Sequence, residues 1–258
     1  MRIVTWNVYG LAGYPKDVSS AVIGTPGEDA NCDHFATVFE QLDADIIAIQ
    51  EGVTHRAAQN IARRCHRHLA TFPSPQNWPG HVLSRFPVVE SRTLSHAVGD
   101  DSLPRFSRTA GAALLQVSED EQLWVVCLHL HPGDVELRAR EGDLLRDRLE
   151  TLLASSANAV VLGDFNCDVS EPIHQHLREL NFVNAMERTD GGLQLTMDTA
   201  DIKPSKIDHI YISASLEPSL SDARVIRDAG FRTDPPRPEG SWDHSDHLPV
   251  RADLNWPI

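Results

Sequence analysis

The chain has 258 residues and 41% of them are hydrophobic, so it can bury a substantial core, and we expect a single domain over 1–258. Its formal net charge is −14, from 23 basic against 37 acidic residues, which argues against an extended surface for binding duplex DNA. No apolar run reaches membrane-spanning length, the start of the chain lacks a secretory-signal pattern, and the four cysteines have neither disulfide-framework nor zinc spacing, so we expect a cytoplasmic protein.

Strand-like and helix-like segments alternate along the chain. Apolar, β-rich runs predict strands at 2–8, 44–49, 81–83, 88–94, 111–117, 123–130, 159–162, 207–212, 223–227 and 248–254. Apolar residues at helical spacing predict helices at 34–42, 54–70, 135–154 and 172–180. The longest intervening segments, expected to be loops, are 11–31, 72–80, 96–110, 186–205 and 229–243.

Two stretches, 81–94 and 111–130, contain neighbouring strands with no helix between them, and we expect each to be a hairpin. Hairpins exclude a purely parallel sheet. The alternation therefore favours an α/β protein in which two mixed sheets pack together and helices flank them.

Polar residues stand where several of these strands end or are interrupted. They are Asn7, Glu51, His129, Asp164, Asn166, Asp208, Asp246 and His247. Each alone has an ordinary explanation as a turn residue, a helix cap or a core histidine. Strand ends on one side of an α/β layer converge on one crevice, however, so the set predicts a composite site. Carboxylate and carboxamide oxygens suit a hard cation such as Mg²⁺ or Mn²⁺.

The order of the short motifs around these residues carries a family resemblance. The motifs are Thr5-Trp6-Asn7, Gln50-Glu51, Leu83-Ser84-Arg85, Leu128-His129-Leu130, Gly163-Asp164-Phe165-Asn166, Ile207-Asp208-His209 and Ser245-Asp246-His247-Leu248-Pro249-Val250. Together they resemble the successive signatures of the endonuclease/exonuclease/phosphatase superfamily, the metal-dependent phosphoesterases of DNase I-like fold. The resemblance implies a four-layer α/β sandwich, with two mixed β-sheets face to face and helices outside.

The same resemblance implies metal-assisted, in-line attack of water on a phosphate ester. Asn7 and Glu51 would hold Mg²⁺ or Mn²⁺, with Glu51 as the main ligand, and Asp246 would contribute to this or to a second metal position. Asp164 would orient and deprotonate the attacking water, and Asn166 would donate to a phosphate oxygen. A metal and fixed donors supply the positioning and charge stabilisation that this chemistry needs.

Three further residues complete the implied set. His247 would bind the phosphoryl oxygens and be oriented by Asp208, while His129 would stand near the leaving oxygen as an acid or hydrogen-bond donor.

The chain departs from the family pattern at three positions. Tyr9 stands where some members carry an acidic residue. His209 occupies a position where an aromatic residue is common, and Glu141 ends an Arg-x-x-Glu motif where Arg-x-x-Gln is usual. Tyr9 therefore argues against a second metal position there. Glu141 leaves open whether the helix at 135–154 supports the site.

We expect residues in the long loops to determine which substrate binds. Arg105 and Arg108 flank Phe106, which predicts a phosphate clamp beside a stacking ring, with a solvated basic loop as the alternative. Trp78 and Trp242 lie in loops rich in proline and glycine, where each could stack on a substrate or anchor the loop.

Three classes of function are compatible with the sequence. Acidity favours a phosphorylated small molecule or a phospholipid headgroup as the substrate. The alternative is a nuclease or an enzyme that processes short nucleic-acid ends. A non-catalytic binding protein on the same scaffold is disfavoured because the catalytic set is complete.

Overall fold

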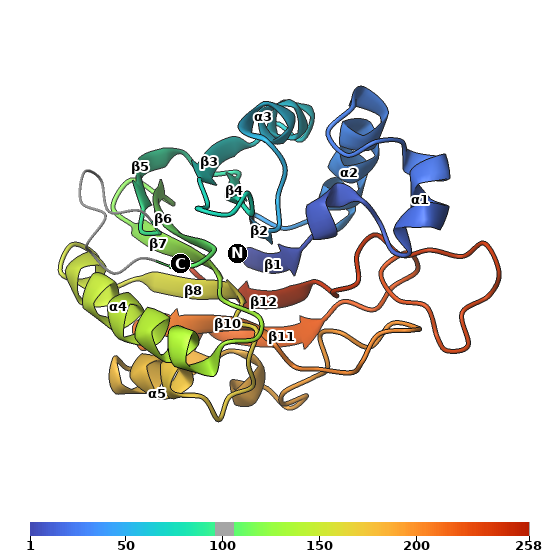
Figure 1. Cartoon of the computed structure of the whole chain (residues 1–258). Helices are drawn as coiled ribbons and strands as arrows, with labels where there is room; N and C mark the ends of the chain where they lie inside the picture. Colours follow the sequence, from blue (N-terminus) through green and yellow to red (C-terminus); the bar gives the residue numbers. More distant parts are fainter. Residues whose placement is uncertain (96–105, 258) are drawn as a thin grey trace.

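The computed structural model describes residues 1–95 and 106–257, and these form two six-stranded mixed sheets (Figure 1). The first sheet has the order β11 (Leu220–Val225), β12 (Val250–Leu254), β1 (Arg2–Asn7), β2 (Ile46–Gln50), β4 (Gly80–Ser84), β3 (His68–Phe72). The second has the order β5 (Val88–Thr93), β6 (Thr109–Gln116), β7 (Gln122–His129), β8 (Ala159–Asp164), β10 (Asp208–Ser213), β9 (Phe182–Asn184). β1 pairs with β2 in parallel and β7 with β8 in parallel, whereas their other neighbours are antiparallel.

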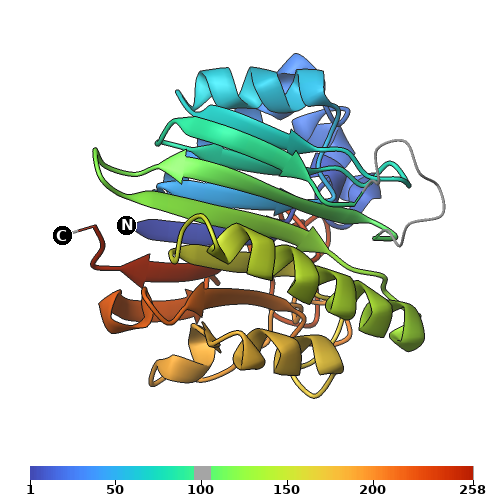
Figure 2. The same ribbon diagram turned by 90° about the vertical axis from the view of Figure 1, so that its left-hand side faces the viewer.

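Helices cover the outer face of each sheet. The first sheet carries α1 (Lys16–Ile23), α2 (Asp29–Gln41) and α3 (His55–Arg64), and the second carries α4 (Val135–Leu153) and α5 (Pro172–Glu179) (Figure 1). Short 3₁₀ helices lie at Tyr9–Leu11, Met186–Arg188 and Glu217–Ser219. Turned by 90°, the molecule shows the sheets stacked between the two helical layers (Figure 2). This is the four-layer α/β sandwich that the motifs imply.

Apolar packing between the layers explains why these segments form. One buried cluster joins the facing sides of the two sheets and continues beneath α2 and α3, where Phe35 and Phe39 contact Trp6 of β1. A second cluster packs α4 and α5 on the outer face of the second sheet. Burial of apolar surface on both faces of the sheets accounts for the nearly continuous hydrophobic runs of β1, β2 and β8.

The predicted helix at 54–70 is wrong beyond Arg64. The Thr54 side chain accepts a hydrogen bond from Ala57 N and caps α3 as a good N-cap does. The helix ends because His66 adopts a positive φ of 53°, and the chain then turns into β3, which pairs antiparallel with β4. The helical spacing in the sequence extends through Leu69 by coincidence, since Leu69 belongs to this strand.

The predicted hairpin at 81–94 is also wrong. β4 pairs with β2 and β3, whereas β5 pairs with β6 in the other sheet. The three residues that join β4 to β5 therefore cross from one sheet to the other. The second predicted hairpin, at 111–130, is confirmed, because β6 and β7 pair antiparallel from Thr109 opposite His129 to Gln116 opposite Gln122.

Besides β3 and the 3₁₀ helices, two elements lie outside the predicted ones: α1, within the expected loop 11–31, and the three-residue strand β9. Both are too short for a periodicity argument to detect them. Within 1–95 and 106–257, no helix combines the length and the apolar character needed to cross a membrane.

Gly163 permits the close approach of β7 and β8 directly before the polar strand ends. It pairs with Leu128 and has a φ of 145°. A Cβ atom at this position would lie 1.9 Å from the Leu128 carbonyl oxygen. Only glycine fits, and the next pair along the ladder is His129 with Asp164. Gly163 thus sets how near these two side chains lie.

We predict that Gly163→Ala lowers the free energy of unfolding by about 3 kcal/mol or more, because the strands must separate or strain. The matched control is Gly133→Ala, at an exposed glycine whose added Cβ meets nothing within 4 Å. That control should change stability by less than about 0.5 kcal/mol. Chemical denaturation measures both, and equal stabilities for the two variants would contradict the steric argument.

Candidate active site

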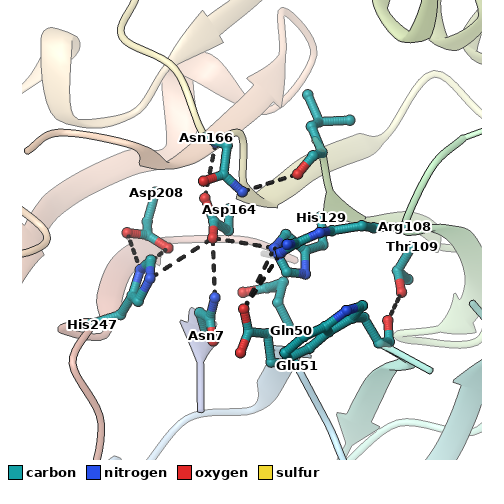
Figure 3. Close-up of polar contacts among 12 residues, drawn as sticks. Asn7, Gln50, Glu51, Arg108, Thr109, His129, Asp164, Asn166, Asp208 and His247 are labelled. Carbon is teal, nitrogen blue, oxygen red and sulfur yellow. Dashed lines mark hydrogen bonds and ion pairs between the residues drawn. The ribbon is translucent and has the colours of Figure 1, made fainter. Parts of the chain in front are cut away.

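The polar residues found at strand ends come together between the two sheets. Figure 3 shows Asn7 and Glu51 facing Asp164 and His129 from the opposite sheet, with His247 beside Asp208. Strand register produces this convergence: Asn7 pairs with Gln50, His129 with Asp164, and Asp164 with Asp208. The sequence prediction of one composite site therefore agrees with the arrangement of these side chains.

Asp164 is at the centre of the group and almost fully buried. Its Oδ2 accepts a 3.0 Å hydrogen bond from Asn7 Nδ2 and lies 3.5 Å from His129 Nε2. Its Oδ1 accepts a 2.9 Å bond from the backbone N–H of Asn166. Burial raises the pKa of the Asp164 carboxyl to about 7, although the positive charge of His247 acts in the opposite direction. A carboxyl with this pKa is suited to exchanging a proton near neutral pH.

His247 and Asp208 form a buried ion pair. His247 Nδ1 lies 3.0 Å from Asp208 Oδ2 and 3.2 Å from Oδ1. Burial alone would lower the pKa of His247, but Asp208 and, more weakly, Asp164 and Asp246 outweigh it and raise that pKa to about 10. The ring is therefore an imidazolium, with its Nε2 3.8 Å from Asp164 Oδ2.

The segment that carries His247 is held by hydrogen bonds to β1. Trp6 Nε1 donates to the carbonyl oxygen of His247 at 3.0 Å, and Ser245 Oγ donates to the carbonyl oxygen of Asn7 at 2.7 Å. Ser245 Oγ also accepts from the backbone N–H of His247 at 3.2 Å. The segment 243–247, which could have been a solvated loop, is instead largely buried.

Glu51 follows β2 in an unusual backbone conformation, with a φ of 50°. Its carbonyl oxygen accepts from Gly10 N at 2.8 Å, which ties the ends of β1 and β2 together. Burial raises the pKa of the Glu51 carboxyl, and the negative charge of Asp246 raises it further, while Asn7 lowers it. A positive φ outside glycine is strained and is often kept at functional sites.

The oxygens of Glu51, Asp246 and Asn7 fit a hard divalent cation. Two carboxylates that repel each other and a carboxamide are the donors that Mg²⁺ and Mn²⁺ accept, and a cation would relieve the repulsion. Asn7 Nδ2 donates to Asp164, and its Oδ1 accepts from Tyr9 N at 3.1 Å, so the carboxamide orientation is fixed.

Asp164, Asp208 and His247 form a second group, because each offers a ligand atom within 4.8 Å of the others. With no cation bound, His247 is protonated, so a metal would have to displace its Nε2 proton before this nitrogen could bind it. The positive charge of His247 already offsets part of the negative charge of the two carboxylates. The chemistry of the donors thus favours the position at Glu51.

Arg108 enters the site from the start of β6. Its Nη1 lies 2.6 Å from His129 Nε2 and 3.5 Å from Glu51 Oε1, and its guanidinium carbon lies 5.0 Å from the centre of the Trp78 ring. Because a guanidinium can only donate, His129 Nε2 accepts. Burial lowers the pKa of His129 well below its usual value, so the ring is neutral and carries its proton on Nδ1.

The predicted clamp is only partly visible. Arg108 lies in the site, while Arg105 lies outside the described residues. Phe106 is fully buried in the outer cluster of the second sheet, so the expectation that it offers a stacking ring to a substrate is wrong. The sequence around an aromatic residue between two arginines does not indicate whether its ring points to solvent or to the core. Here the ring is buried in the apolar core.

Helix α4 supports the site through Glu141, a contribution that sequence reasoning left in question. Glu141 Oε1 accepts from Ser107 N at 2.7 Å and from Ser107 Oγ at 2.6 Å, and its Oε2 accepts from His131 N at 3.2 Å. This buried carboxylate joins the residue before Arg108 to the segment after His129. Glutamate thus ties both segments to α4.

Asn166 follows Asp164 by two residues, and His209 follows Asp208 and contacts His174 of α5. Asn166 has a φ of 52° and donates from Nδ2 to Leu130 O at 2.9 Å, which leaves its second amide hydrogen for another acceptor. His209 is fully buried, contacts Asn184 and has a pKa lowered to about 4 by burial. His209 is therefore a neutral core histidine.

Comparisons with known proteins agree with this geometry. The sequence profile described as "Endonuclease/Exonuclease/phosphatase family" matches residues 4–247. A search of curated protein sequences gives no match.

Solved structures similar to the chain span nearly its whole length. One is a conserved protein of unknown function from Enterococcus faecalis, at 17% identity and a TM-score of 0.74, covering 98% of this chain and 99% of that one. Another is a mannosyl-6-phosphatase from Bacteroides thetaiotaomicron, at 18% identity and 0.72, covering 98% and 99%. A third is the 3′ phosphatase NExo from Neisseria bound to a product DNA hairpin, at 18% and 0.69, covering 99% and 100%. Such identities establish the fold alone.

We predict that Asp208→Asn lowers the pKa of His247 from about 10 by roughly one to three pH units, because the main charge that opposes burial is lost. The pKa of His247 is measured from the pH dependence of its imidazole NMR signals. Asp253→Asn is the matched control, since Asp253 pairs with Arg2 and Arg251. An unchanged His247 titration in Asp208→Asn would disprove the ion pair.

Proposed function

The chain belongs to the Endonuclease/Exonuclease/phosphatase family, whose members hydrolyse phosphate esters, and we propose that it acts on a phosphorylated small molecule or a phospholipid headgroup. The observation that supports a catalytic role is the convergence of Glu51, Asp164 and the His247–Asp208 pair at one point between the sheets. A single catalytic domain over 1–258 and a cytoplasmic location are part of the proposal.

The proposed cofactor is Mg²⁺ or Mn²⁺, held by Glu51 with Asn7 and Asp246. When bound there, the ion supplies positive charge to the phosphoryl oxygens as negative charge develops on them. Both ions fit the oxygen donors, and nothing in the donor set separates one from the other.

Asp164 is proposed to orient the attacking water and take its proton. Asn7 and the backbone N–H of Asn166 hold the two oxygens of this carboxyl, so its direction is fixed before the substrate arrives. The pKa near 7 supports this role, because the base must be partly deprotonated at neutral pH and still hold a proton afterwards.

His247 is proposed to bind the phosphoryl oxygens as their charge grows. Asp208 keeps the ring charged and fixes its orientation through Nδ1, which leaves the Nε2 proton for the substrate. The second amide hydrogen of Asn166 is proposed to donate to a non-bridging phosphate oxygen.

His129 and Arg108 are proposed to act on the leaving-group side. Arg108 binds a phosphate oxygen and in doing so releases His129 Nε2. Neutral imidazole can carry its proton on either nitrogen, so His129 can then donate to the leaving oxygen. Arg108 is 15% exposed at its side chain, which allows such a contact with a ligand.

Charge supports a small substrate. The chain has three lysines, and many of its arginines pair with acids, as Arg85 does with Asp43 and Asp45. Paired arginines have less charge to offer to a run of DNA phosphates. The mannosyl-6-phosphatase neighbour agrees with this proposal, and the NExo neighbour, bound to DNA, keeps a nuclease as the alternative.

The test is a substrate panel after removal of metal by EDTA and dialysis. We expect no hydrolysis until Mg²⁺ or Mn²⁺ is added, and then a higher kcat/KM for small phosphoesters, including bis(p-nitrophenyl) phosphate, than for plasmid DNA. The log–log salt dependence should correspond to roughly one to three phosphate contacts, at a slope of about −0.9 per contact.

The control in this assay is Asp164→Ala, which should lower kcat by about 10²-fold or more and so exclude a contaminating enzyme. Full activity in excess EDTA would disprove metal dependence. Efficient plasmid nicking with a steep salt dependence would replace the small-substrate proposal with the nuclease.

A further inference from the structure

A pocket of about 280 Å³ adjoins Glu51 on the side of the first sheet. It is lined by Tyr9, Gly10, Ala12, Lys16, Pro26, Glu51 and Trp78. We propose that this pocket binds a single ring of the substrate between Trp78 and Tyr9, and that Lys16 binds a second anionic group on the same substrate. The inference rests on the proposed function and names the class of substrate: a monocyclic phosphoester that carries a second anion.

The size and position of the pocket suit a small part of the substrate next to the reacting phosphate. Glu51 belongs both to the site and to the pocket lining, so a ligand in the pocket lies next to the reacting phosphate. A volume of about 280 Å³ is near the lower end of small-molecule sites, which is room for one ring and its substituents. A duplex or a long acyl chain would need a larger surface.

Trp78 forms one wall of the pocket, and contacts with Thr109 and Arg108 fix its position. The hydroxyl of Thr109 donates to its carbonyl oxygen, and the Arg108 guanidinium packs over its ring. Trp78 lines the pocket and is half-buried. An aromatic surface fixed in this way can stack on a ring with little loss of side-chain entropy.

Tyr9 supplies a second aromatic wall, two residues after Asn7. Its backbone has a φ of 49°, and its ring meets Tyr14 edge to face at 6.3 Å. The backbone N–H of Tyr9 donates to Asn7 Oδ1, so the position of this ring is tied to that of the site. The pocket thus has two positioned aromatic residues from different parts of the chain.

Lys16 is the cation among the pocket residues, and Glu51 is the acid. Lys16 is exposed at the start of α1, and it forms no ion pair with any of the described residues. In a chain with three lysines and a net charge of −14, an unpaired ammonium beside the site offers attraction for an anion. The reacting phosphate is proposed to bind at His247, Asn166 and Arg108, which are not among the pocket-lining residues, so the anion at Lys16 is a second one.

The test compares substrates with one and two phosphates on the same ring. The pairs are glucose 6-phosphate with glucose 1,6-bisphosphate, and phenyl phosphate with benzene-1,4-diyl bisphosphate; glycerol 3-phosphate has no ring. Wild-type enzyme with Mg²⁺ should have a higher kcat/KM for the bisphosphate, and the preferred pair tells whether the ring is a sugar or an aromatic ring.

Lys16→Gln should lower the ratio of kcat/KM between bisphosphate and monophosphate about fivefold, as expected for one exposed ion pair. Lys203→Gln makes the same charge change at an exposed lysine outside the pocket and should leave the ratio unchanged. Trp78→Ala should lower kcat/KM about tenfold more for the ring substrates than for glycerol 3-phosphate, and Trp78→Phe should restore most of the difference.

The outcomes separate this inference from the proposed function. An unchanged ratio in Lys16→Gln, or an equal loss on ring and acyclic substrates in Trp78→Ala, would overturn the pocket inference. Hydrolysis of bis(p-nitrophenyl) phosphate with none of the ring monoesters would also overturn it and leave the proposed function standing. If wild-type enzyme with added metal hydrolyses no phosphoester at all, the proposed function itself fails.

Discussion

The burial of several carboxylates at one seam between two sheets is the constraint on which the site depends. Asp164 and Asp208 are nearly inaccessible to water, and Glu51 is largely so. Buried carboxylates repel one another and lose hydration, so they need positive charge close by. The imidazolium of His247 supplies it on one side and Arg108 on the other. The same charges that make burial tolerable stand where a phosphate would bind.

The fold brings these charges together through backbone features that leave few alternatives. Gly163 lets β7 and β8 approach, so that His129 and Asp164 lie opposite each other. Positive φ angles at Glu51 and Asn166 turn the chain directly after β2 and β8 and aim their side chains into the seam. Strain at such positions is typical of sites where geometry matters more than stability.

Sequence reasoning predicted the layers and the core of the site, because strand ends and ordered motifs are local signals. The predictions from sequence were wrong or incomplete where the partner of a strand or side chain lies far away in the chain. The connection from β4 to β5 looks like a hairpin locally, although the strands belong to different sheets. Arg108 contacts His129 because β6 pairs with β7. Glu141 contacts Ser107 because of where α4 packs on the second sheet. Neither register nor helix position can be read from spacing alone.

The location of the metal distinguishes the two groups of acidic residues that lie side by side in the site. Crystals soaked with Mn²⁺ and phosphate would reveal the ion by its anomalous scattering. We expect a peak about 2.1 Å from a carboxylate oxygen of Glu51, on the side of Asn7 and Asp246. A peak centred among Asp164, Asp208 and His247 would contradict this expectation, since His247 would then have to be a neutral ligand and not the cation that balances the buried carboxylates.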